Sequence, residues 1–377
     1  MVIINLKVVT LNKVIENGYI EIENKKIKSI GKMPYLGNQS EVIDGHNQIA
    51  MPGFIDIHIH GSCGIDFMDA KEEDYQVIAN ALYSEGVTSF LATTLTSDKK
   101  SLKKVCKEVY KAKKHVSSLA GIHLEGPYIS QKYKGAQNEA FIRNPDVNEL
   151  NELIKASHKN IRYITLAPEK EGAMEFIKYA TENGVVVSAG HSNATFKDVE
   201  KAISYGLTNT THTHNAMSGH HHRNPGVLTA AFYFDNLFTE FICDGIHVCD
   251  DVLKTSYKII GPERFIIITD SLQAKHSDKT KFVLFGMDCI VKDGAAYLEK
   301  EGNLAGSLLT MERAIQKMQA ITGASLVEIA RIASTNAARA IHLKKVGELR
   351  KGYLADIVLL SDELKVKEVY KLGSKVF

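Results

Sequence analysis

The chain has 377 residues, of which 44% are hydrophobic and 24% are charged, and its formal net charge is +2. This composition is typical of a folded protein with an ample core, and the absence of basic blocks with interleaved aromatics argues against a nucleic-acid-binding protein. No apolar run reaches about 18 residues, so no membrane-spanning helix is expected. Because the N-terminus lacks a charged leader followed by an apolar segment, we expect a cytoplasmic location.

Five cysteines are an odd number, and no two of them form a Cys-x-x-Cys pair. This pattern argues against both a disulfide framework and a thiolate zinc site. Cys63 follows two histidines and is interpreted as a small loop residue rather than as a metal ligand or nucleophile.

The two ends of the chain resemble each other in their short, alternating apolar and polar runs. Between residues 2 and 50, Asn17-Gly18 and Asp44-Gly45 are hairpin-type turn signals, which predict a small antiparallel sheet. Such a sheet cannot close a core alone, and two further strand-like segments lie near the C-terminus. We therefore predict one β-sandwich domain made from both termini. Its predicted segments are 1–51 and 345–377.

Residues 52–344 alternate between strand-like and helix-like segments, which is typical of parallel β/α units. Eight strands are predicted, and this is the number that closes a (β/α)8 barrel of the TIM type. The predicted strands are 53–61, 87–94, 119–124, 161–166, 185–189, 209–211, 237–243 and 264–269. The helices predicted around the barrel are 72–85, 99–115, 173–183, 197–204, 309–319 and 326–338, and a hairpin is predicted over 282–298 with its turn at 292–294.

The first predicted barrel strand carries two histidines at alternate positions. Alternate residues of a strand point to the same face, so His58 and His60 share one face while Ile57 and Ile59 pack behind them. On this spacing alone two interpretations stay open, because such a pair can bind one metal ion or can be a hydrogen-bonded part of the core.

Four other strands end in residues that can bind metal or transfer protons. Glu125, His191, His212 and Asp270 stand at or just beyond the predicted ends of the third, fifth, sixth and eighth strands. In a barrel these ends meet at one mouth, where such folds carry their active sites. Each residue alone could be a cap or a core residue. Together with the first strand's pair they indicate a metal site.

Histidine and carboxylate ligands with an open position are typical of zinc or a similar divalent ion. Such an ion lowers the pKa of a bound water from about 15.7 to about 7. Asp270 is then the natural acid/base, and hydrolysis of an amide or ester fits this equipment.

Nine stretches in order along the chain resemble the N-acetylglucosamine-6-phosphate deacetylases of the amidohydrolase superfamily. They are PGFIDIHIHG (52–61), HLEGPYIS (123–130), AGHSNAT (189–195), THTHNAM (211–217), HHRNPG (221–226), DGIHV (244–248), TDS (269–271), NLAGSLLTM (303–311) and GELRKGYLADIVLL (347–360). The resemblance implies that Glu125, His191 and His212 are the principal metal ligands and that Asp270 is the catalytic acid/base. His58 and His60 match a pair that only some members keep, so one or two ions of zinc or iron per subunit are expected.

The resemblance also implies a phosphosugar pocket. Contacts to the sugar phosphate are expected from Asn215, Ala216 and Arg223, and His247 matches a residue that reaches the substrate of a neighbouring subunit, which implies a homodimer. The remaining pocket residues implied are Ala136, Leu304, Ala305 and Gly306. A departure occurs at Gln137, where the family typically has a histidine that polarises the acetyl carbonyl. Glutamine can donate a hydrogen bond but carries no charge, so oxyanion stabilisation is expected to be weaker.

The predicted reaction is deacetylation of N-acetylglucosamine 6-phosphate to glucosamine 6-phosphate and acetate. One alternative is the galactosamine epimer, and another is a cyclic amide of the dihydroorotase type, against which the glutamate at position 125 counts because a bridging lysine is absent there. A third alternative is a non-catalytic metal-binding relative whose site has decayed at Gln137. Histidines 220–222 are interpreted as part of an exposed polar loop.

Overall fold

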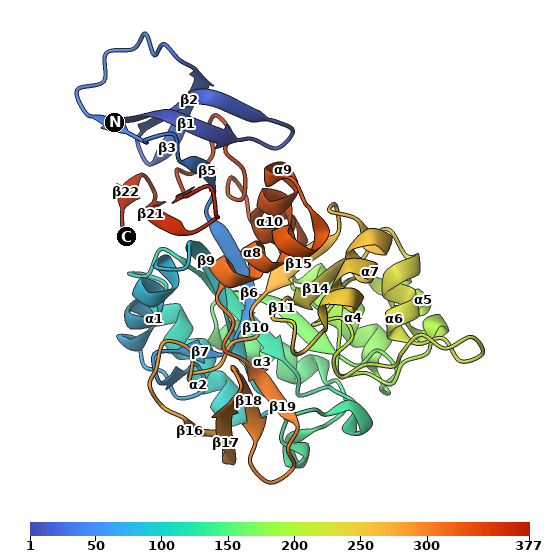
Figure 1. Cartoon of the computed structure of the whole chain (residues 1–377). Helices are drawn as coiled ribbons and strands as arrows, with labels where there is room; N and C mark the ends of the chain where they lie inside the picture. Colours follow the sequence, from blue (N-terminus) through green and yellow to red (C-terminus); the bar gives the residue numbers. More distant parts are fainter.

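The computed structural model describes residues 1–377 and contains four sheets. In Figure 1 the sheet built from the two chain termini lies at one end of the molecule, the barrel lies in the middle, and a small sheet made from β16 to β19 lies at the other end. None of the helices has both the length and the apolar character needed to cross a bilayer.

Eight parallel strands form the barrel, in the order β15-β14-β13-β12-β11-β10-β9-β6. They are β6 (Phe54–Ile59), β9 (Val87–Thr94), β10 (Leu119–Glu125), β11 (Ile161–Leu166), β12 (Val186–Ala189), β13 (Leu207–Thr210), β14 (Phe238–Ile242) and β15 (Phe265–Ile268). The barrel closes just beyond β15, where the amide of Asp270 donates to the carbonyl of His58 (2.8 Å) and the amide of His60 donates to the carbonyl of Ser271 (2.9 Å). The predicted (β/α)8 fold is confirmed.

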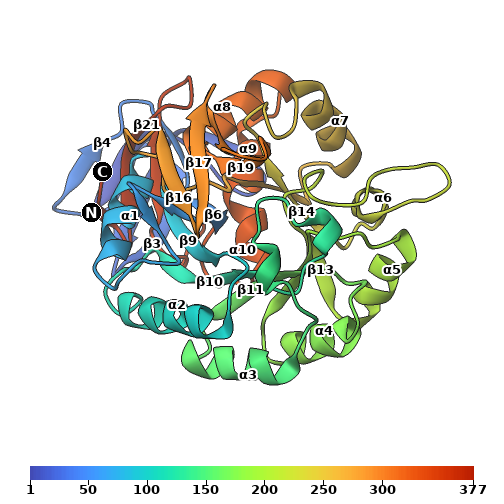
Figure 2. The ribbon, with the colours of Figure 1, turned by 90° about the horizontal axis from the view of Figure 1, so that it is seen from below.

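Helices surround these strands, as the view along the barrel in Figure 2 shows. They are α1 (Asp74–Tyr83), α2 (Lys99–Ala112), α3 (Val147–Ala156), α4 (Ala173–Glu182), α5 (Phe196–Tyr205), α6 (Val227–Tyr233), α7 (Asp250–Ile260) and α8 (Met311–Thr322), followed by α9 (Leu326–Ala330), a π-helical turn (Arg331–Thr335) and α10 (Asn336–Ala340). The sequence prediction lacks α3, α6 and α7. Helix α2 shows why these segments fold, because Asp98 caps its first turn and Leu102, Val105 and Val109 bury one face.

The terminal sheet has the strand order β22-β21-β20-β5-β1-β2-β3, with β4 beside β1. Its strands are β1 (Val2–Val9), β2 (Val14–Glu23), β3 (Lys26–Lys32), β4 (Val42–Asp44), β5 (Ile49–Pro52), β20 (Ile357–Leu360), β21 (Val366–Lys371) and β22 (Ser374–Lys375). Both ends of the chain also share a separate hydrophobic core, which includes Ile3, Leu6 and Leu359. This core supports a domain built from both termini, while the exact boundaries at 52 and 344 stay predictions.

Two details of the sequence prediction are wrong. Asn17-Gly18 does not form a hairpin turn but lies inside β2, where Asn17 has a φ of 48° and the pairing with β1 is irregular. The two-residue turn lies instead at Asn24-Lys25, where both residues have positive φ. The sheet is also mixed, because β4 and β5 both pair in parallel with β1.

The segment predicted as one hairpin is a four-stranded antiparallel sheet of β16 (Lys281–Leu284), β17 (Met287–Lys292), β18 (Ala295–Leu298) and β19 (Leu304–Ser307). The predicted turn at 292–294 is confirmed. A second turn at Phe285-Gly286, where both residues have positive φ, divides the first predicted strand into β16 and β17. The amide of Ser307 donates to the carbonyl of Asp270 (2.8 Å), so this sheet is fixed to the end of β15.

Candidate metal centre

Six side chains predicted from the sequence converge at the carboxyl ends of the barrel strands. His58 lies in β6 and His60 just beyond it, Glu125 ends β10, and the other three residues each stand two positions after a strand. Each of these last three, His191, His212 and Asp270, has a positive φ, between 29° and 49°. Non-glycine residues rarely adopt this conformation, and it clusters at functional sites. All six are buried, with Asp270 the most exposed at 9%.

Glu125 occupies the centre of this group. Its Oε1 atom lies 3.2 Å from Nε2 of His191 and 3.1 Å from Nε2 of His212. The two imidazole nitrogens are themselves 3.0 Å apart. These three side chains therefore direct one oxygen and two nitrogens at a common point.

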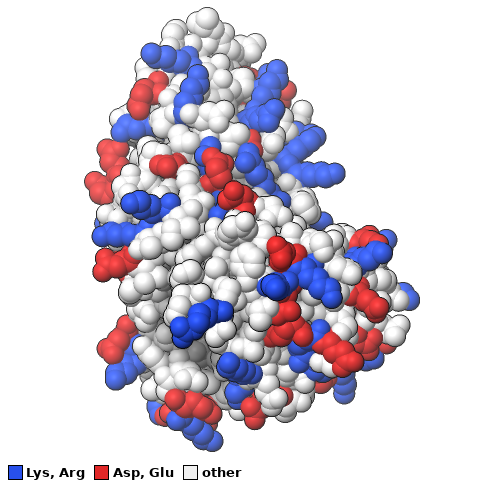
Figure 3. Space-filling model, turned by 90° about the vertical axis from the view of Figure 1, so that its right-hand side faces the viewer, with Lys and Arg blue, Asp and Glu red and all other residues white.

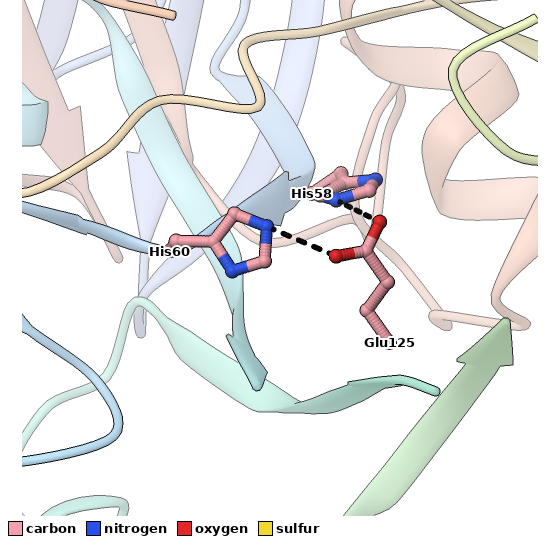
Figure 4. Close-up of side chains that lie close together, drawn as sticks. All are labelled: His58, His60 and Glu125. Atoms are coloured by element: carbon pink, nitrogen blue, oxygen red, sulfur yellow. Dashed lines mark ion pairs between the residues drawn. The ribbon is translucent and has the colours of Figure 1, made fainter. Parts of the chain in front are cut away.

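A second group shares the same carboxylate. Figure 4 shows the rings of His58 and His60 facing the two oxygens of Glu125, with Nε2 of His58 3.2 Å from Oε1 and Nε2 of His60 3.3 Å from Oε2. Asp270 faces the same two ring nitrogens, and its Oδ1 atom is 3.2 Å from His60 Nε2 and 3.4 Å from His58 Nε2. These contacts show that all six predicted residues meet.

The chemistry of these atoms fits a divalent metal ion. His191 donates from Nδ1 to the carbonyl of Tyr133 (2.8 Å), so the neutral form of this ring has its lone pair on Nε2, the atom that faces His212 and Glu125. Two nitrogen lone pairs and a carboxylate at such close distances repel one another unless a proton or a cation lies between them. Zinc–nitrogen bonds of about 2.0–2.1 Å would separate two ligand nitrogens by roughly the spacing seen here.

Charges in the group act strongly on one another. Burial lowers the pKa of His58, but the carboxylates of Glu125 and Asp270 outweigh burial, and its pKa lies well above the usual 6.5. The same balance raises the pKa of His60 to about 9. Burial alone would raise the pKa of Glu125 and Asp270, yet the facing histidines hold both below their usual values. The carboxylates are thus ionised and offer negative charge to a cation.

Gln137 contacts the centre directly. Its Nε2 atom donates to Oε2 of Glu125 (2.5 Å), and its Oε1 atom accepts the amide of Thr96 (2.7 Å). Both ends of the side chain are therefore held. This contact to Glu125 is absent from the sequence prediction, which gives Gln137 a role at the acetyl carbonyl, and that catalytic role stays a prediction.

Five of the six residues, all except His58, line a cavity of about 140 Å³. It is lined by Gln137 and by most of the residues predicted to bind substrate, namely Ala136, Asn215, Ala216, His247, Leu304, Ala305 and Gly306. His247 is oriented by Asp244, whose Oδ2 atom is 2.7 Å from His247 Nδ1. The cavity walls come from the barrel loops and from the β16–β19 sheet.

Arg223 does not line this cavity. It lies on the exposed loop that precedes α6, with His220, His221 and His222 beside it, all exposed. Figures 1 and 2 show this loop projecting away from the barrel. The predicted exposed polar loop is thus confirmed, and the phosphate contact of Arg223 stays a prediction.

Two residues that contact the histidines are missing from the sequence prediction. Tyr133 supplies the carbonyl that orients His191, and Glu240 in β14 lies 3.2 Å from Nδ1 of His58. The strand Phe238–Ile242 holds Glu240 beside Thr239 and three apolar residues, and this composition alone gives Glu240 no functional signal.

A model of the amidohydrolase family matches residues 49–376. The chain belongs to the amidohydrolase family. It is 34% identical to the N-acetylglucosamine-6-phosphate deacetylase of Lysinibacillus sphaericus, over 99% of this chain and 97% of that protein. It is 32% identical to the N-acetylgalactosamine-6-phosphate deacetylase of Escherichia coli O157:H7, over 86% of this chain and 87% of that protein.

Among solved structures, a mutant of the N-acetyl-D-glucosamine-6-phosphate deacetylase of Mycobacterium smegmatis is in complex with N-acetyl-D-glucosamine-6-phosphate. This chain is 29% identical to it, and the two structures superpose with a TM-score of 0.94 over 100% of this chain and 99% of that one. The match supports the barrel-plus-terminal-sheet fold over the whole length. Metal dependence is a property of the amidohydrolase family, and the two groups around Glu125 are the candidate metal-binding clusters of this chain.

Proposed function

We propose that this amidohydrolase removes the acetyl group from N-acetylglucosamine 6-phosphate, giving glucosamine 6-phosphate and acetate. The observation that carries this proposal is one cavity whose floor holds Asp270 and the metal-type ligands and whose walls hold the substrate residues implied by the resemblance. The similarity to deacetylases over nearly the full length supports the same reaction.

A divalent ion bound by Glu125, His191 and His212 would polarise the acetyl carbonyl and acidify water. In the metal-free chain the charges of His58 and His60 hold the pKa of Asp270 below its usual value, and bound metal ions would supply the positive charge in their place. Asp270 can therefore first accept a proton from the attacking water and then donate that proton to the departing amide nitrogen. Gln137 donates to Glu125 and keeps that carboxylate oriented; a second hydrogen on its amide is available for the acetyl oxygen.

We propose zinc or iron as the metal, with one or two ions per subunit. Two groups of possible ligands share Glu125, and this arrangement supports two ions. With a single ion bound by Glu125, His191 and His212, the nitrogens of His58 and His60 would face Glu125 without a cation of their own. Each ion would have two imidazole nitrogens and one carboxylate oxygen from the protein.

The phosphate end of the substrate is assigned to Asn215, Ala216, His247 and Arg223. Arg223 offers the forked donors that a phosphate dianion prefers, but its loop points away from its own cavity. A homodimer is therefore part of the proposal. His247 lines the cavity of its own chain, so the predicted contribution of His247 across an interface has to be tested together with Arg223. A cytoplasmic location also stays a prediction.

The decisive test is acetate release by metal-reconstituted protein from N-acetylglucosamine 6-phosphate, with unphosphorylated N-acetylglucosamine alongside and metal counted on the same sample. We expect turnover that requires both the metal and the phosphate. A fully metal-loaded protein that releases no acetate from any N-acetyl hexosamine phosphate would overturn the proposal and favour a non-catalytic relative.

The second candidate substrate is N-acetylgalactosamine 6-phosphate. The similarity to the Escherichia coli O157:H7 protein named for that activity favours it specifically. Comparing kcat/KM for the two epimers in one assay decides between them, because specificity is the ratio of these two values.

A further inference from the structure

Glu240 is a completely buried carboxylate with no part in the proposed reaction. It lies in the middle of β14, and its exposed fraction is 0%. Its Oε2 atom is 3.2 Å from Nδ1 of His58 and 3.3 Å from the backbone nitrogen of His212. Both partners belong to metal-ligand residues, one from each of the two groups.

Such a carboxylate is costly to bury. Transfer of an ionised group from water costs several kcal/mol even after the protein relaxes, and Glu240 recovers little of this from hydrogen bonds. Its Oε1 atom makes no hydrogen bond within normal geometry. The Tyr163 hydroxyl lies near this carboxylate, and burial together with the charge of Glu240 raises the pKa of that hydroxyl. No lysine or arginine pairs with Glu240. Stability alone therefore does not account for a glutamate at this position.

The contact with His58 has a definite chemical consequence. A carboxylate facing Nδ1 holds the ring proton on that nitrogen, so the lone pair of neutral His58 is on Nε2 and points toward Glu125 and Asp270. Carboxylates that orient metal-binding histidines in this way also make them more basic ligands. His60 differs, because its Nδ1 atom is buried without a partner.

The local charge points in the same direction. Glu125, Glu240 and Asp270 bring three carboxylates within 3.4 Å of the His58 ring, and no lysine or arginine lines the cavity. Counted as ionised, these three carboxylates keep a net charge of −1 beside one divalent cation, so the group can accept further positive charge from a second cation.

We propose that Glu240 is a positioning residue that fixes His58 with Nε2 toward Glu125, so that His58 can act as a ligand in the second of the two proposed metal groups. This inference rests on the proposed metal centre but not on the identity of the substrate. It assigns to β14 a role in metal binding that the ligand set alone does not reveal.

Glu240→Gln tests the proposal by metal binding instead of activity. The wild-type chain should bind two zinc ions in equilibrium dialysis against buffered zinc, and E240Q should bind one of them about 10- to 100-fold more weakly. Glu149→Gln is the matched control, because Glu149 is also buried and ionically paired but contacts Arg143 instead of a histidine. It should keep both ions. A wild-type chain that binds a single ion, or an E240Q chain that binds two as tightly as wild type, would overturn the proposal.

A second measurement uses the wild-type protein and does not require E240Q to fold. Nitrogen-15 NMR of the zinc-loaded chain, with His58→Asn used to assign the ring, should show a proton on Nδ1 of His58 and zinc on Nε2. Zinc on Nδ1, or a ring whose nitrogen shifts do not respond to zinc, would overturn it. A protein that passes these tests but releases no acetate would refute the proposed function and leave this inference intact.

Discussion

The floor and the rim of the cavity are built differently. On the floor, the side chains of Glu125, His191 and Asp270 are buried and follow strand ends whose backbones are hydrogen-bonded across the barrel. On the rim, Arg223 lies on an exposed loop, and the side chain of its neighbour His221 bonds only backbone nitrogens of that same loop. The candidate metal centre is therefore assembled within one chain, while the proposed phosphate contact of Arg223 belongs to an exposed loop outside the cavity.

The surface charge, drawn for one face in Figure 3, bears on how the rim could bind an anion. On the face shown, Lys and Arg side chains are interspersed with Asp and Glu side chains and form no field of one sign. Recognition of a small anion must then come from a few local donors, because long-range attraction requires a larger excess of one charge. The contrast predicts that floor substitutions affect catalysis or stability strongly and that rim substitutions affect substrate binding moderately.

The largest effect is expected from Asp270→Asn. Asparagine keeps the size of the side chain but cannot transfer the proton, and general acid–base groups contribute about 10²- to 10⁴-fold to rates. We expect kcat to fall by about 10³-fold while the metal content stays unchanged. Turnover and bound metal should be measured on the same preparation. Full activity in this variant would remove Asp270 from the mechanism.

Lys275→Met should produce the largest loss of stability. The Lys275 ammonium pairs with Glu85 at 2.7 Å, and the two side chains are only 1% and 2% exposed. The carbonyl of Lys275 also accepts the amide of Cys63, which ties the loop after Asp270 to the loop after His60. Removing one partner of a buried pair typically costs about 3–5 kcal/mol, because the other charge stays buried.

The double variant Lys275→Met with Glu85→Gln is the control for this prediction. Glutamine removes the uncompensated charge but can still accept the amide of Met311, which Glu85 accepts at 2.6 Å. Chemical denaturation should therefore show the double variant to be more stable than K275M alone. Equal free energies of unfolding would mean that the ion pair is not what holds this loop.

The sequence predicts the residues of the cavity floor far better than it predicts the buried side chains that contact them. His58, Glu125, His191 and Asp270 could be found because strand periodicity and barrel topology place residues at strand ends, whatever the loops do. Glu240 could not, since its partner His58 is 182 positions away and a lone glutamate in a five-residue strand has no spacing signal.

Turn signals in the sequence are misleading where strand pairing, and not the local residues, determines the backbone conformation. Asn17-Gly18 has the composition of a hairpin turn, but the pairing of β1 with β2 continues past it and turns it into an irregularity within the strand. Helix α3 was missing from the prediction even though Leu150, Leu153 and Ile154 carry a helical apolar pattern. The position of Arg223 outside the cavity depends on the conformation of an exposed loop, which no motif encodes.

A smaller, pH-dependent effect is expected at Asp66, which follows the first ligand strand. Burial raises its pKa from 3.8 to about 6, and its Oδ2 atom has no partner. Because the folded state binds the Asp66 proton more tightly than the unfolded state, protonation of Asp66 stabilises the fold. This contribution is fully present below pH 3.8 and is lost as the pH rises through about 6. The total is at most about 3 kcal/mol, and about half of it falls between pH 5 and 8.

Asp66→Asn should remove this dependence. The free energy of unfolding of the variant, relative to that of wild type, should rise by about 1–1.5 kcal/mol between pH 5 and pH 8. Denaturation with metal-loaded protein at both pH values measures the difference. A difference that does not change with pH would show that Asp66 is not a buried group of raised pKa.

The most moderate effect is expected on the rim, from Arg223→Ala. If Arg223 binds the phosphate from a second copy, its loss should raise KM for the phosphosugar about tenfold, equivalent to about 1.4 kcal/mol, with kcat unchanged. His222→Ala is the matched control, since His222 is an equally exposed neighbour on the same loop. Light scattering should find a dimer in all three proteins. An unchanged KM in R223A, or a fully active monomer, would mean that the floor and His247 suffice for the phosphate and that the cavity is complete within one chain.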